Sequence, residues 1–101
     1  MAETAETTGP LAFAASFPPD ERFVAAAAEI SARLAASYGC ASEAAEEIRG
    51  AVQIAFRQAL ASPRPGGGDI SLTLRGEDGV FDADVAAGGT ALCHCSKPRT
   101  A

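Results

Sequence analysis

Three cysteines and the single histidine are the residues whose chemistry is most distinctive in this sequence. Cys93, His94 and Cys95 are consecutive, and Cys40 could supply a fourth ligand to zinc or copper. Structural zinc sites usually place about two to four residues between paired cysteines, whereas one residue separates Cys93 from Cys95. The spacing leaves two interpretations open: a Cys/His metal or thiol sensor, and a flexible tail whose cysteines happen to be close.

The other candidates for catalysis or phosphate binding have simpler structural explanations. His94 has no acid partner in a segment expected to fold, so we interpret it as a solvated tail residue. The run Gly66–Gly68 lacks the Lys and Ser/Thr of a phosphate-binding loop and precedes a strand rather than a helix. Glu43, Glu46 and Glu47 are typical of a helix N-terminus, where negative charge is favoured.

Charge and length exclude several functional classes. The chain of 101 residues suffices for one domain, and its 24 alanines leave few large side chains for the core. A formal net charge of -5 argues against binding the phosphate backbone of nucleic acids. No apolar run reaches the length of a membrane span. The odd number of cysteines favours a reducing cytoplasm as the location.

Hydrophobic periodicity predicts the elements of one small domain. They are a strand at 11–17, a helix from Asp20 to Gly39, a helix from Ser42, a loop at Ser62–Gly68 and a hairpin over 70–85, turned at Gly76–Gly79. Gly39 suits the left-handed end of a helix. Gly50, in the middle of the second helix, is expected to weaken that helix unless close packing requires it.

The order strand–helix–helix–strand–strand predicts an α/β two-layer sandwich, with two helices on a three-stranded sheet. We expect residues 1–10 to be a disordered N-terminal lead without the basic residues of a secretory signal, 11–89 to form the domain, and 90–101 to be a flexible tail. The residues expected to be buried together in the core are Phe23, Ile30, Leu34, Val52, Phe56, Leu72, Leu74 and Phe81.

Three stretches carry a resemblance to a known family: "LAFAASFPPDERFVAAAAEISARLAASYG", "SEAAEEIRGAVQIAFRQAL" and "GGGDISLTLRGEDGVFDADVAAGG". In this order they resemble the start of the GHKL-type ATPase domain of histidine kinases. Within that superfamily they are most similar to the bacterial anti-sigma-factor serine kinases. The resemblance covers roughly residues 11–89 and rests on the succession of elements and their periodicity.

The resemblance also implies that the ATP site is degenerate. The family's catalytic Glu and its magnesium-ligating Asn fall on Ile54 and Gln58, and a slip of one residue would put Gln53 at the first position. None of these side chains is a base. The family's Asp-x-Gly-x-Gly box falls on Ala86–Gly89, where Ala87 replaces the adenine-binding Asp. The chain also ends before the family's ATP lid, which implies a truncated domain without ATP hydrolysis or tight ATP binding.

The expected function is that of a non-catalytic protein-interaction or regulatory module on a degenerate histidine kinase-like fold, such as a bacterial signalling adaptor. We assign no catalytic residue, no cofactor and no metal ligand. The alternatives are a weak nucleotide-binding regulator of the anti-sigma type and a Cys/His metal or thiol sensor. We expect a protein partner, with no nucleic acid and no membrane. Asp82 and Asp84, on one face of a strand, could contact a basic partner or simply be solvated.

A homodimer, or a chain that is stable only with its partner, is also expected. A three-stranded sheet leaves two edges with unpaired backbone groups, and the Ala-rich helices bury little area per residue. The strand at 11–17 or the strand at 80–85 would pair with its counterpart across a two-fold axis. A helix face through Ala25–Ala28 is the alternative contact between copies.

Overall fold

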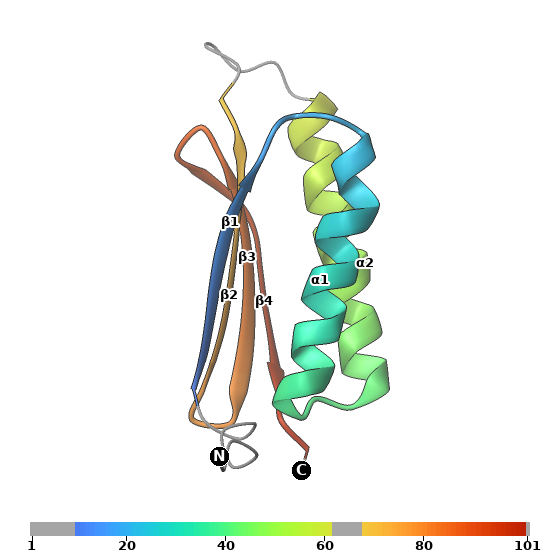
Figure 1. Ribbon diagram of the computed structural model, residues 1–101, viewed down its shortest axis with the longest axis vertical. Coiled ribbons are helices and arrows are strands. Elements are labelled where there is room, and N and C mark those ends of the chain that lie inside the picture. Colours follow the sequence, from blue (N-terminus) through green and yellow to red (C-terminus); the bar gives the residue numbers. More distant parts are fainter. Residues whose placement is uncertain (1–9, 62–67, 101) are drawn as a thin grey trace, which may run out of the picture.

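Among the described residues, two helices pack on one face of an antiparallel sheet and leave the other face open (Figure 1). The computed structural model describes residues 10–61 and 68–100. The elements in chain order are β1 (Leu11–Phe17), α1 (Arg22–Tyr38), α2 (Ser42–Ala61), β2 (Ile70–Glu77), β3 (Val80–Ala87) and β4 (Thr90–Pro98). The predicted α/β architecture with two helices is confirmed. The expected N-terminal lead and the expected loop fall mostly on residues 1–9 and 62–67, which lie outside the described residues.

The sheet contains four strands in the order β1-β2-β3-β4, so the prediction of three strands is wrong. Each pair of neighbours is antiparallel. Phe13 lies opposite Leu74 across β1 and β2, and Leu72 lies opposite Val85 across β2 and β3. Directly opposite residues share a face of the sheet, so the apolar positions of these strands form continuous rows on the side of the helices.

The fourth strand is formed by residues that the sequence predicts to be a flexible tail, 90–101. Gly88 and Gly89 have φ angles of 59° and 79°. Two successive positive φ angles are typical of the two-residue turns that connect antiparallel strands. An isolated bridge between Cys40 and Arg99 also ties the end of the chain to the segment between the helices. The strand escaped prediction because the irregularity in its pairing with β3 interrupts the alternation of apolar and polar residues.

Local hydrogen bonds explain where α1 begins and ends. Oδ1 of Asp20 accepts a hydrogen bond from the backbone N–H of Arg22 at 2.9 Å. Gly39 follows the helix with a φ of 114°, and its N–H donates to the carbonyl of Ala36 at 3.1 Å. The predicted left-handed end of this helix is confirmed, and the chain can turn directly into α2.

The buried face of α1 differs from the predicted one. Phe23, Ile30 and Leu34 are only partly buried at the margin of the core. The residues that face the core are Val24, Ala27, Ala28, Ser31, Ala32, Ala35 and Tyr38. Small side chains let α1 lie close to the sheet and to α2, so the bulky residues are displaced to the side of the helix. The hydroxyl of Ser31 is satisfied in this buried position by the carbonyl of Ala27 at 2.8 Å.

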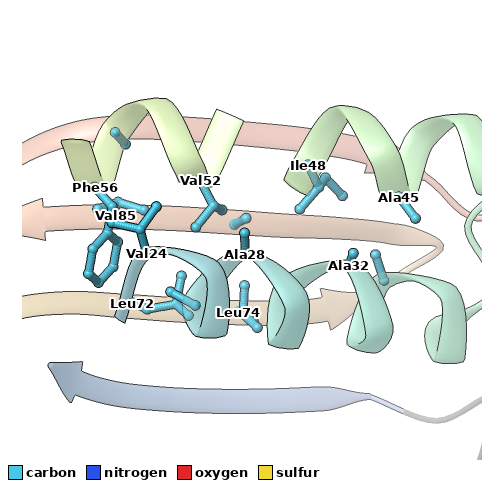
Figure 2. Close-up of a cluster of buried hydrophobic side chains, with 14 of the residues drawn as sticks. Val24, Ala28, Ala32, Ala45, Ile48, Val52, Phe56, Leu72, Leu74 and Val85 are labelled. Atoms are coloured by element: carbon cyan, nitrogen blue, oxygen red, sulfur yellow. The ribbon is translucent and has the colours of Figure 1, made fainter. Parts of the chain in front are cut away.

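The core between the two layers combines side chains from both helices and the sheet (Figure 2). The other predicted core residues are all fully buried there: Val52, Phe56, Leu72, Leu74 and Phe81. These positions were predictable because α2 and the hairpin each have one apolar face and no other way to cover it.

Tyr38 requires a glycine near the end of β2. A Cβ atom at Gly76 would lie 2.6 Å from Cδ1 of the Tyr38 ring. The phenolic oxygen of Tyr38 accepts a hydrogen bond from the N–H of Gly79 at 3.0 Å. Gly76 therefore belongs to β2 and not to the turn, which is shorter than predicted and centres on Asp78 and Gly79, with φ angles of 56° and 80°.

Candidate functional site

The positions that the family resemblance assigns to an ATP site differ in exposure and lie on two elements, α2 and β3. Ile54 has 62% of its surface exposed, and Gln58 is also exposed, so both side chains point from α2 into solvent. Gln53 is half-buried on the same helix. Ala87 is buried on the helix-facing side of β3. Asp84, three residues earlier, points to the opposite face of the sheet, so its carboxylate does not lie beside Ala87.

An open hollow lies instead between the two helices. Its lining residues are Ala32, Arg33, Ala36, Ser42, Ala45, Glu46 and Arg49. Arg49 donates to Glu29 at 2.5 Å and to Glu46 at 3.2 Å, and Arg33 donates to Glu29 at 2.6 Å. Both guanidinium groups are thus neutralised by carboxylates. The hollow offers no unpaired cation to an anionic ligand.

The structure separates His94 from the cysteines that flank it. Cys93 and Cys95 lie opposite Val85 and Ala83, on the helix-facing side of β4, whereas His94 lies opposite Asp84 on the open face. Successive residues of a strand point to opposite faces, so the three side chains do not converge on one ion. Within residues 10–61 and 68–100, no group of three or more His, Cys, Asp or Glu is arranged to hold a metal.

The three thiols are free in the described chain. Cys40 is buried, and its sulfur lies 4.0 Å from the carbonyl oxygen of Lys97. Burial raises the pKa of the Cys40 thiol, and burial is also the largest cause of the raised pKa of Cys93. A raised pKa keeps a thiol protonated at neutral pH and lowers its reactivity. Cys40 and Cys93 therefore lack the lowered pKa that is typical of reactive thiols.

A β-bulge decides which residues of β4 face the helices. Ala86 pairs with Ala91, but Asp84 pairs with His94, so β4 carries one extra residue between these two pairs. A shift of one residue exchanges the two faces of a strand. Without the bulge, His94 would point toward the helices. With it, the only histidine of the chain lies on the open face of the sheet.

On that open face, four side chains of β3 and β4 form a chain of hydrogen bonds. Nδ1 of His94 lies 2.5 Å from Oδ1 of Asp84, and Nε2 lies 3.2 Å from the hydroxyl oxygen of Ser96. The hydroxyl of Ser96 donates in turn to Asp82. The expectation that His94 has no acid partner is therefore wrong. Its partner could not be found from the sequence, because the bulge that creates the pairing has no sequence signature here.

The connection Ser96–His94–Asp84 has the order of a hydrolase triad, but its geometry favours a different role. In a triad the serine proton is directed at the imidazole, whereas Ser96 donates its proton to Asp82. The His94 and Asp84 side chains are 64% and 40% exposed on the sheet surface. All contacts are satisfied when both imidazole nitrogens carry protons, and the Asp84 carboxylate raises the pKa of His94. The cluster is best described as a hydrogen-bonded link between β3 and β4.

Known proteins give no further guidance. Comparison with protein-family models, with curated protein sequences and with solved structures finds no match. None of the described helices combines the length and apolar character needed to cross a membrane.

The two edges of the four-stranded sheet differ in how well they are protected against pairing. The β4 edge has the bulge, the titratable His94 and the terminal Pro98. It also has an inward-pointing cation, Lys97, that forms an ion pair with Glu47 of α2. Bulges, prolines and inward charges are the devices by which sheet edges avoid unwanted strand pairing. The β4 edge is therefore protected against pairing with another strand.

The β1 edge has none of these devices. Its seven residues, Leu11–Phe17, include no charge, no proline and no bulge against β2. Among the described residues, no strand pairs with its outer side. The other strand named as an edge from the sequence, 80–85, is an interior strand because β3 is paired on both sides, so that prediction is wrong.

Half-buried apolar side chains accompany the β1 edge. We call this set the apolar margin; its members are Leu11, Phe13, Phe17, Phe23, Ile30 and Leu34. Phe23, Ile30 and Leu34 share a face of α1, since they are seven and four residues apart. This face is turned away from Ala32, Arg33 and Ala36, which line the hollow between α1 and α2. The ring centroids of Phe17 and Phe23 are 5.8 Å apart, which joins the strand and helix parts of the margin.

Proposed function

We propose that the chain is a non-catalytic protein-interaction module that binds its partner at the β1 edge and the apolar margin. The proposal rests mainly on one observation: the edge strand β1 has no feature that prevents strand pairing, and the half-buried side chains of the apolar margin lie beside it. An extended segment of another chain can add to such an edge through backbone hydrogen bonds, while its side chains bury the apolar margin. The open sheet face and the helix hollow lack comparable features in the described residues.

The wider role that we propose is that of a cytoplasmic regulatory adaptor in bacterial signalling, on a degenerate histidine kinase-like fold. The succession strand–helix–helix–hairpin supports this proposal. The solvent-exposed Ile54 and Gln58 also support it, because neither position could serve in ATP hydrolysis.

The binding proposal is tested by capturing partners from the native cytoplasm with two matched variants. Ala14 and Ala91 are both exposed alanines on edge strands, on β1 and β4 respectively. Ala14→Lys puts a charge on the β1 edge and is expected to abolish capture of the protein that occupies this edge, whether another protein or an untagged copy of the chain itself. Ala91→Lys, the control, is expected to retain it. Equal capture by both variants would show that the β1 edge is not the binding surface.

The alternative function, a weak nucleotide-binding regulator, makes a different prediction. A ligand present at 100 times its dissociation constant stabilises the folded state by about 2.7 kcal/mol. We expect millimolar magnesium-ATP to leave the melting temperature unchanged. A shift of several degrees that Gln58→Ala removes would favour the alternative.

A further inference from the structure

We infer that the strand added to β1 is β1 of a second copy of this chain, in one defined antiparallel register. The inference rests on the proposed function, because it names the partner that occupies the same edge. It follows from the spacing of the residues in β1, from the absence of charge on the strand and from the position of the apolar margin.

The register follows from two requirements. Residues that lie directly opposite each other in an antiparallel pair share a face of the sheet, so a two-fold axis must pass through a residue of β1. Only an axis at the middle residue, Ala14, pairs all seven positions of Leu11–Phe17. An axis at Phe13 or Ala15 would leave two residues at one end of each strand unpaired within the seven.

This register places side chains of complementary size opposite each other. On the helix-facing side, Leu11 lies opposite Phe17 of the second copy, and Phe13 lies opposite Ala15. Each large aromatic ring then has a smaller residue across from it, and the rings lie on diagonals where aromatic side chains can still reach one another. On the open face, Ala14 lies opposite Ala14 and Ala12 opposite Ser16, so nothing bulky keeps the two strands apart.

Charge also favours this pairing. Because β1 has no ionisable side chain, joining two copies removes no charge on the strand from water and brings no like charges together. The β4 edge is not free of charge in this way, because Lys97 points inward and forms an ion pair with Glu47. A second copy paired at β1 would extend the sheet to twice its number of strands and leave a β4 strand at each outer end.

In the dimer, the apolar margin adds buried side-chain surface to the backbone hydrogen bonds between the two β1 strands. Stable interfaces bury about 800 Å² per partner, which requires side chains in addition to a short strand. Phe23, Ile30 and Leu34 lie on the β1 side of α1 and are partly exposed in the single chain. In the dimer, the two α1 helices flank the seam between the β1 strands, and these side chains can close over it. The isologous contact then buries the margin of both copies.

A charge-exchange experiment tests both the partner and the register. The wild-type chain is expected to sediment as a dimer at micromolar concentrations. In this register Ala14→Lys places two ammonium groups directly opposite each other, and Ala14→Glu places two carboxylates opposite each other. Each variant alone is expected to dissociate more readily than the wild type, by up to about fivefold in the dissociation constant. An equimolar mixture of the two is expected to restore the dimer as a heterodimer.

The control is Ala91→Lys on the β4 edge, which is expected to remain dimeric. Circular dichroism checks that every variant is folded, and Ala14 is suited to substitution because it is exposed. A wild-type chain that stays a folded monomer up to several hundred micromolar would overturn the inference. So would a dimer that both Ala14 variants leave intact, or variants that dissociate but are not restored by mixing.

These failures differ from a failure of the proposed function. If the chain is monomeric but captures another protein in a way that Ala14→Lys abolishes, the second copy is excluded and the β1 binding edge stands. If the chain is monomeric and Ala14→Lys leaves capture unchanged, both the inference and the proposed function fail.

Discussion

Two glycines, Gly50 and Gly76, should respond to alanine in opposite directions. Gly50 lies in the middle of α2, and an added Cβ would meet no atom within 4 Å. Gly76 lies in β2, where an added Cβ would approach the Tyr38 ring to 2.6 Å at Cδ1 and 2.7 Å at Cε1. The ring is buried and its hydroxyl is bonded to Gly79, so it cannot move aside freely.

The magnitudes follow from these surroundings. Gly50→Ala removes the excess flexibility of a helical glycine and should raise the free energy of unfolding by about 0.5–1 kcal/mol. Gly76→Ala overpacks the core and should lower it by about 1–3 kcal/mol. In a domain of this size each 1 kcal/mol corresponds to about 4–8 °C in melting temperature. Calorimetry of the two variants at one protein concentration, high enough to keep them in the same oligomeric state, measures both shifts.

A double-mutant cycle identifies the cause at Gly76. Tyr38→Leu shortens the side chain that the new methyl group meets, so Gly76→Ala should cost less in that background than in the wild type. If Gly76→Ala is neutral in the wild type, or costs the same in both backgrounds, the close approach of Tyr38 is not the reason for glycine at this position. A destabilising Gly50→Ala would show that the outer side of α2 is not open.

The remaining predictions concern the core and the histidine. Phe56→Ala should lower the free energy of unfolding by about 3–5 kcal/mol, measured by urea denaturation, since the ring is fully buried; a variant that melts within a few degrees of the wild type would contradict this packing. The pKa of His94 is raised in the folded chain, mainly by its hydrogen bond to Asp84. Its stabilising effect should be complete below the ordinary histidine pKa of about 6.5 and should disappear as the pH rises through the folded-state value. An NMR titration of His94 in the wild type and in Asp84→Asn should show a lower pKa in the variant, and equal values would exclude the Asp84 contact.

The elements with a complete buried face could be predicted from the sequence. In α2, apolar residues recur at helical spacing through Ile48, Val52 and Phe56, and all three are buried. The hairpin alternates apolar and polar residues from Ile70 to Val85 in the way that a sheet with one covered face requires. In both cases a single pattern determines the structure, because each apolar stripe has only the opposing layer to cover it.

The phase of α1 could not be predicted in the same way. The helix has large residues at Phe23, Ile30 and Leu34, and small residues one position away at Val24, Ser31 and Ala35. Hydrophobicity alone selects the large set as the buried face. Packing selects the small set, because α1 must fit closely against two other elements at once, and this constraint is visible only after the helices and sheet are assembled.

The bulge in β4 could not be predicted from the sequence either. It helps to protect the β4 edge against strand pairing, and the proposed function depends on the difference between this edge and the β1 edge. A single extra residue after the Gly88–Gly89 turn puts Lys97 on the helix side, where it meets Glu47, and puts His94 on the open side, where it meets Asp84. Both ion pairs lie on β4 and make this edge a poor template for another strand. Of the two edge strands, β1 has no ionisable side chain, whereas β4 has His94 and Lys97. The uncharged β1 remains as the edge of the described sheet that can accept a strand at the least electrostatic cost.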